Sequence, residues 1–145
     1  YRKESKGSYD NVIASAGGYP KDINFIQSHK SLHNAASFVR DKGNLILLAE
    51  CSDGIGNDEF FRIFTDGTKK DILDKLKIHY TGNGGTALSL LSKTERINVH
   101  MITSLSKEVC NALNIYTLNF KDLQSAVSRL NGNTAIIENA SMLYC

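Results

Sequence analysis

Uninterrupted apolar runs, rather than runs that alternate with polar residues, mark the strands of this chain. The clearest run is 45–49, where five consecutive apolar residues leave no polar face. Such a strand must be covered on both sides, as the central strands of parallel sheets are. Shorter apolar runs bounded by glycine or polar clusters predict further strands at 11–16, 97–103, 116–118 and 135–137.

Apolar residues at helical spacing separate these runs. Asp22 is predicted to cap a helix that follows Pro20, runs to about Arg40 and is ended by Gly43. Further helices are predicted at 58–65, 68–77, 84–94, 107–113 and 120–130. In the last of these, five apolar residues at helical spacing are expected to face inward: Phe120, Leu123, Ala126, Val127 and Leu130.

Strands that alternate with helices predict an α/β fold. Right-handed crossovers then give a three-layer sandwich built on a doubly wound, mainly parallel sheet of about five strands. The 145 residues contain no repeat, low-complexity tract or linker, so we expect a single domain over 1–145. Because the chain begins at Tyr1 without a methionine, we expect it to be one domain of a longer protein.

Composition and charge exclude several classes of partner. The chain is 41% hydrophobic and 22% charged, as ordinary globular proteins are. Its formal net charge is only +2 and its basic residues are scattered, so we expect no nucleic-acid partner. Three cysteines without a CxxC pair indicate a cytoplasmic protein rather than a disulfide framework or a zinc ribbon. No apolar run is long enough to predict a membrane span.

Glycine-containing turns follow the first two predicted strands, where open parallel sheets bind their ligands. The first turn leads into the helix whose early turns carry Gln27 and Lys30. Free N–H groups and the positive dipole end of a helix start suit an anion. This turn is therefore predicted to form one wall of a site for a small anionic substrate or a phosphate-bearing cofactor.

Four glycines of the two turns are candidates for backbone contact with a cofactor: Gly17, Gly18, Gly54 and Gly56. Neither turn contains the GxGxxG pattern of dinucleotide-binding folds, and 82–85 lacks the GK[ST] of a P-loop. Neither of these stand-alone nucleotide sites is therefore predicted.

Gln27 and Lys30 lie three residues apart and are neighbours on one face of the predicted helix. Their amide and ammonium groups could together hold the hydroxyl and carboxylate of a substrate. Both could instead be solvent-facing positions of an amphipathic helix, and spacing alone favours that interpretation.

Two other features have metal-binding or nucleophilic alternatives. His29 and His33 have the spacing of a helical metal site, but no HExxH pattern or third ligand accompanies them, so surface histidines are expected. Cys51 follows a strand, where a nucleophile could be presented, but no histidine is placed beside it by the sequence. A buried structural thiol is expected there, and no metal site is predicted anywhere in the chain.

Both turns resemble the C-terminal domain of the nickel-pincer lactate racemase (LarA-like) family. The first reads GGYPKDIN over 17–24 and is followed by Gln27 and Lys30. The second reads AECSDGIG over 49–56, followed by Phe60, and is similar to the family's AEC-x-x-G-[IL]-G segment. The resemblance covers most of the chain, and it weakens after residue 80, where the chain has no tryptophan and reads GNGGT over 82–86.

The resemblance implies the C-terminal domain of a two-domain 2-hydroxy-acid racemase or epimerase. The family's cofactor, a nickel-pincer nucleotide that accepts a hydride, is held by the N-terminal domain, which would be this domain's partner. The resemblance implies that Gln27 and Lys30 orient and neutralise the substrate, and that the isolated domain is inactive. It leaves open which 2-hydroxy acid is used.

Two other functions agree with the residues. One is a non-enzymatic α/β module that binds a nucleotide or metabolite at the strand ends. The other is a redox or interaction domain that uses Cys51.

Overall fold

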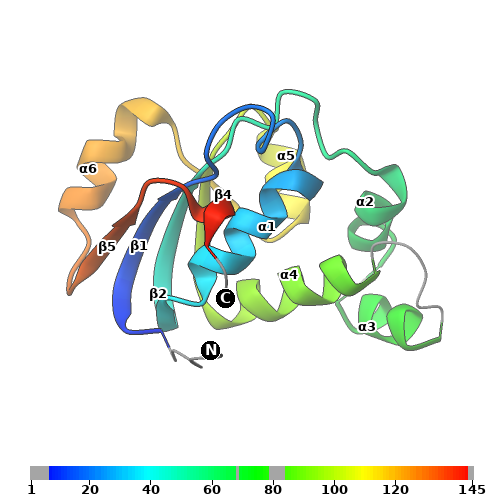
Figure 1. Cartoon of the computed structure of the whole chain (residues 1–145). Helices are drawn as coiled ribbons and strands as arrows, with labels where there is room; N and C mark the ends of the chain where they lie inside the picture. The colour runs from blue at the N-terminus through cyan, green and yellow to red at the C-terminus, as the bar shows by residue number, and fades with distance from the viewer. Residues whose placement is uncertain (1–6, 68, 79–83, 144–145) are drawn as a thin grey trace.

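The computed structural model describes residues 7–67, 69–78 and 84–143. They form one parallel five-stranded sheet in the order β4-β3-β2-β1-β5, surrounded by helices (Figure 1). The strands are β1 Tyr9–Ser15, β2 Val39–Leu48, β3 Asn98–Ile102, β4 Tyr116–Thr117 and β5 Thr134–Ile137. The α-helices are α1 Phe25–Ala36, α2 Asp58–Thr65, α3 Lys69–Ile78, α4 Gly84–Arg96, α5 Lys107–Ala112 and α6 Leu123–Ser128, with short 3-10 turns η1 Phe120–Asp122 and η2 Ala140–Met142. The predicted α/β sandwich with a parallel sheet is confirmed.

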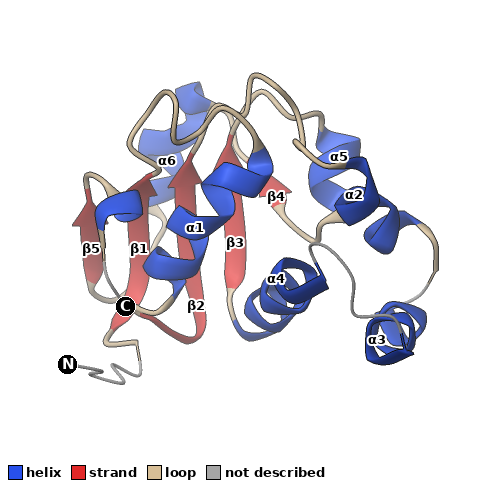
Figure 2. Ribbon diagram, turned by 45° about the vertical axis from the view of Figure 1, so that its right-hand side comes forward, coloured by secondary structure: helices blue, strands red, loops and turns tan. Residues whose placement is uncertain are grey.

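Helices cover the two faces of the sheet unequally. α1 and α4 lie across one face, whereas α6 lies on the other (Figure 2). The strand order explains this arrangement. The connections from β1 to β2, β2 to β3 and β3 to β4 all move in one direction along the sheet, and the connection from β4 to β5 moves back in the other direction. Right-handed crossovers that run in opposite directions place their helices on opposite faces. None of the described helices combines the length and apolar character that a membrane span requires.

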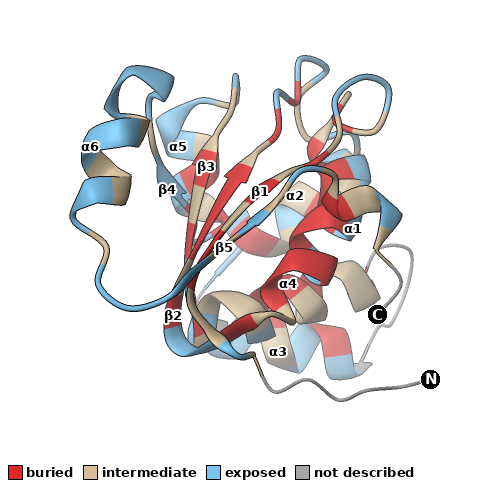
Figure 3. Ribbon diagram, turned by 60° about the vertical axis from the view of Figure 1, so that its left-hand side comes forward, coloured by how far each residue is buried: buried red, intermediate tan, exposed pale blue. Residues whose placement is uncertain are grey.

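The core lies between the sheet and α1 and α4, where the buried residues are concentrated (Figure 3). Six strand residues with at most 1% exposure form its floor: Val12, Ala14, Leu45, Leu47, Val99 and Met101. Phe25 and Leu32 of α1 and Leu90 of α4 are fully buried in the same cluster. The apolar runs of β1 and β2 were therefore a sound guide to central strands.

The outer face of the sheet is covered only in part, and here the prediction for 120–130 was wrong. The α-helix in this segment, α6, spans only Leu123–Ser128, and none of its residues is buried (Figure 3). Phe120 lies in η1 and is 68% exposed, and Ile136 on β5 is 75% exposed. The apolar spacing correctly marks one side of a helix, but spacing cannot tell how far a second layer reaches across a sheet.

The predicted helix from Asp22 to Arg40 was wrong at both ends. Asn24 is the N-cap, and its side chain accepts a hydrogen bond from the third residue of the helix. α1 ends at Ala36, and β2 already begins at Val39 because this segment pairs with Tyr9 of β1. Pairing with a neighbouring strand thus overrides the local helical pattern.

Gly43 does not end a helix but lies inside β2, beside an irregularity in the pairing of β1 and β2. A Cβ on this glycine would stand 2.6 Å from the Asp10 carbonyl oxygen and 2.6 Å from Val39 Cγ1. Close approach of the two backbones therefore requires glycine here.

Asn34 ties the end of the described chain to α1. Its buried side-chain Nδ2 donates to the carbonyl oxygens of Ala140 and Leu143, both at 2.8 Å. These bonds hold η2 against α1, next to the turn that follows β1.

Asn34→Ala is expected to destabilise the fold by about 2 kcal/mol, because it leaves two carbonyls near the core without their donor. Urea unfolding measures the loss, and hydrogen exchange should rise first at 139–143. Asn111→Ala, at an exposed position of α5, is the matched control and should change stability little. Equal effects of the two substitutions would contradict this role.

Candidate functional site

The turns after β1 and β2 are joined by backbone hydrogen bonds. The N–H of Cys51 donates to the carbonyl of Asp22, and the N–H of Asp53 donates to the carbonyl of Ile23, each at 2.8 Å. The Asp22 carboxylate accepts a further bond from the N–H of Glu50 at 3.1 Å. The two turns that carry the family resemblance therefore fold as one unit at the carboxyl edge of the sheet.

This union uses the N–H groups at the start of α1. Phe25 donates to the carbonyl of Gly54 at 3.0 Å, and Ile26 donates to the carbonyl of Ile55 at 3.1 Å. The next N–H is bound by the side chain of Asn24. The expectation of free N–H groups for an anion was therefore wrong, because the second turn occupies them.

Gln27 and Lys30 are both exposed on α1. With His33 they form the exposed stripe of the helix, at successive three-residue steps. Neither side chain forms a hydrogen bond or ion pair that would hold it against another described residue. The stripe is thus open to a ligand or to another part of the protein, on a helix start that the second turn holds in place.

His29 was expected at the surface, and this was wrong. The residue is 8% exposed, and its Nε2 is buried without a hydrogen-bond partner among the described residues. Burial, together with the nearby Lys93 and His33 charges, lowers the pKa of His29 to about 4. The centroids of the His29 and His33 rings are 6.5 Å apart. Nδ1 of His33 lies 3.4 Å from the hydroxyl oxygen of Ser89 on α4.

Cys51 is buried, as expected, and it has a φ of 54° in the turn after β2. Its Sγ lies 3.4 Å from the hydroxyl of Ser28 on α1. Burial raises the pKa of the Cys51 thiol, which disfavours the reactive thiolate. This environment is that of a packing residue that joins the second turn to α1.

Neighbouring side chains account for two of the four candidate glycines. A Cβ on Gly17 would lie 2.4 Å from Oδ1 of Asn139, and a Cβ on Gly56 would lie 2.5 Å from Cγ of Asn24. Gly18 and Gly54 also have positive φ, and a Cβ there would meet open space. The missing side chain of Gly56 thus makes room for the cap of α1.

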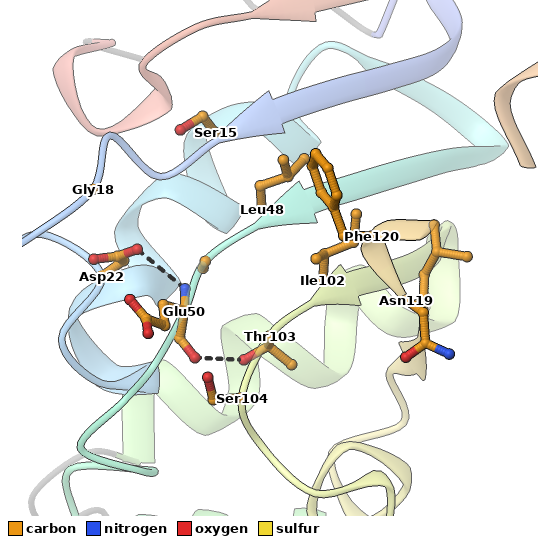
Figure 4. A pocket seen from close by; sticks show the side chains of 12 residues that line it. Ser15, Gly18, Asp22, Leu48, Glu50, Ile102, Thr103, Ser104, Asn119 and Phe120 are labelled. Atoms are coloured by element: carbon orange, nitrogen blue, oxygen red, sulfur yellow. Dashed lines mark hydrogen bonds between the residues drawn. The ribbon is translucent and has the colours of Figure 1, made fainter. Parts of the chain in front are cut away.

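A cavity of about 460 Å³ lies where the carboxyl ends of β1, β2, β3 and β4 meet (Figure 4). The carboxylates of Asp22 and Glu50 line one part of it, and Leu48, Ile102 and Phe120 line another. No lysine or arginine is among the described residues that line this cavity. Its charged lining is therefore acidic.

The structure does not bring the predicted residues together in this cavity. Gly18 lines it, but the Gln27–Lys30 pair and the other three candidate glycines do not. Sequence reasoning did not single out this cavity. A signal was present, since Glu50, Thr103 and Asn119 each follow a strand, but only the parallel sheet brings those positions to one edge.

The described residues do not fit a nickel-bound nucleotide. They contain no group of three or more histidine, cysteine or acidic side chains arranged to hold a metal. The cavity at the strand ends presents two carboxylates, which repel a phosphate. No step of a reaction is therefore derived through that group for these residues.

Gly56→Ala is expected to be more destabilising than Gly54→Ala. Both substitutions place a side chain at positive φ, but only the first drives a Cβ into Asn24. The difference should equal about 1 kcal/mol, the usual worth of an N-cap. In urea unfolding, Gly56→Ala should also cost less when Asn24 is already alanine, and strict additivity would contradict the coupling.

Stability should fall as the pH drops from about 6.5 towards 4. The folded state keeps His29 neutral, whereas the unfolded chain takes up its proton below the ordinary value of 6.5. The loss is on the order of 3 kcal/mol at full protonation. Unfolding free energies measured from pH 7.5 to 4 check it. His29→Gln should flatten the profile far more than His33→Gln, because His33 is exposed, and equal flattening would contradict the assignment.

Known proteins match most of this chain. The lactate racemase C-terminal domain family matches residues 4–134. A lactate racemase of Thermoanaerobacterium thermosaccharolyticum is 40% identical over 68 residues, which make up 46% of this chain and 16% of that relative. The solved structure of the lactate racemase apoprotein from that organism matches with a TM-score of 0.83 and 26% identity, covering 94% of this chain and 35% of that one. The chain spans about a third of the solved protein, and it belongs to the lactate racemase C-terminal domain family.

Proposed function

We propose that this domain supplies substrate-binding residues to a 2-hydroxy-acid racemase or epimerase. Membership of the lactate racemase C-terminal domain family supports this class of enzyme. Because the chain spans only about a third of the solved relative, the reaction belongs to the full-length protein. The remaining part, an N-terminal domain, would hold the nickel-pincer nucleotide, whose chemistry when bound is to accept a hydride.

The observation that carries the proposal is the exposed pair Gln27 and Lys30 on α1. The ammonium of Lys30 would pair with the substrate carboxylate, and the Gln27 amide would hydrogen-bond the substrate's hydroxyl or carboxylate. The union of the two turns supports a binding role, because it holds the first turn of α1 in one position.

The two other functions have less support. A nucleotide-binding module would need a cation or free N–H groups for the phosphate, but the cavity is acidic and the N–H groups at the start of α1 are occupied. A redox domain would need a reactive Cys51, whereas its thiol is buried with a raised pKa. A clear thermal shift of the domain with a nucleotide, or fast thiol labelling at neutral pH, would favour these alternatives.

Lys30→Ala in the full-length protein, produced with its cofactor-making enzymes, is expected to lower kcat/KM about 10- to 100-fold. This range corresponds to the loss of one charge-assisted contact. Racemisation of a panel of 2-hydroxy acids, followed by chiral chromatography, measures the loss and identifies the substrate.

Two controls sharpen this experiment. Lys107→Ala removes an exposed lysine of α5 and should leave activity unchanged. Gln27→Glu places a carboxylate beside the substrate's own and should raise KM more than Gln27→Ala does. Unchanged activity of Lys30→Ala on every racemised acid would refute the proposed role of Lys30.

A further inference from the structure

We propose that the cavity at the carboxyl ends of β1 to β4 is a second binding site, and that its ligand is an amphipathic organic cation. The cavity is separate from the pair on α1, since neither Gln27 nor Lys30 lines it. Its volume of about 460 Å³ lies in the range of small-molecule sites. It also lies where parallel sheets bind ligands, outside the carboxyl ends of strands.

The apolar part of the cavity suits the body of such a ligand. Leu48 and Ile102 come from adjacent strands and are paired in register, so they form a continuous apolar surface. Phe120 lies beside them and also lines the cavity (Figure 4). Its side chain is 68% exposed to solvent. A ligand ring or alkyl chain placed here would cover the Phe120 ring and remove apolar surface from water.

The polar part determines the charge of the ligand. The Asp22 carboxylate is held by the N–H of Glu50 through one oxygen, and its other oxygen has no hydrogen bond to a described residue. The Glu50 side chain is exposed at the cavity, and its backbone carbonyl is fixed by the Thr103 hydroxyl at 3.0 Å (Figure 4). The described lining contains these two carboxylates and no lysine or arginine, so it attracts an ammonium group and repels a carboxylate or phosphate.

Two further polar side chains are available to the ligand. The Ser104 hydroxyl and the Asn119 amide both line the cavity, and neither forms a hydrogen bond to another described residue. An ammonium brings up to three N–H donors, which match these acceptors and the two carboxylates. The exposed Phe120 ring adds an attraction for a cation at its face.

This site is distinct from the proposed substrate site by the sign of its charge. A 2-hydroxy acid carries a carboxylate, which Lys30 would attract and the cavity would repel. One edge of the domain therefore presents two sites of opposite preference, and the second does not depend on the racemase reaction.

The experiment titrates the full-length protein by calorimetry with 2-phenylethylammonium, 2-phenylethanol and 3-phenylpropionate, which share a ring and differ in charge. The ammonium is expected to bind at least ten times more tightly than the propionate, with the alcohol between them. Binding should weaken as salt is raised, because the attraction is partly between exposed charges.

Variants locate the binding. Glu50→Gln should weaken 2-phenylethylammonium at least fivefold, whereas Asp53→Asn, which removes a charge from the same turn outside the cavity, should not. Phe120→Ala should weaken both the ammonium and the alcohol. Lys30→Ala should leave ammonium binding unchanged, so failure of this proposal is distinguishable from failure of the racemase proposal.

Three results would overturn the assignment. The first is equal binding of the propionate and the ammonium. The second is an equal loss with Glu50→Gln and Asp53→Asn. The third is no binding of the ammonium to the full-length protein.

Discussion

Backbone hydrogen bonds between the turn after β1 and the turn after β2 set the geometry at the carboxyl edge of this domain. Peptide N–H groups of 51–53 bind carbonyls of 22–23, and the first N–H groups of α1 bind carbonyls of 54–55. Each buried peptide group must have a partner, so neither turn could keep its shape without the other. Both proposed sites on this edge depend on these bonds. These bonds fix the position of the start of α1, and the N–H of Glu50 holds the carboxylate of Asp22.

Neighbouring side chains explain two of the four candidate glycines without a ligand. Gly56 leaves room for Asn24, the cap of α1, and Gly17 leaves room for Asn139. Their place in turns after parallel strands had predicted backbone contacts with a cofactor. At Gly17 and Gly56 the missing side chain instead lets an amide side chain approach the backbone, whereas Gly18 and Gly54 face open space.

The two faces of the sheet differ in how far helices bury them. The face under α1 and α4 is buried, and the Nε2 of His29 is buried there without a hydrogen-bond partner among the described residues. On the outer face α6 buries none of its residues, and rows of polar and apolar residues lie side by side. Asn11, Asn44 and Asn98 form one such row, with hydrogen bonds from strand to strand.

The sequence by itself determined the strands, the parallel sheet and the family, because apolar runs and the two turn motifs are local and specific. It also predicted that Gln27 and Lys30 are neighbours on one face of α1, since three-residue spacing fixes neighbours on a helix. Only the tertiary structure decided where α1 ends, because pairing of Val39 with β1 outweighs the helical pattern there. It alone decided that His29 is buried while His33 is exposed. The acidic cavity could not be predicted, because its walls come from four strand ends that only the completed sheet brings to one edge.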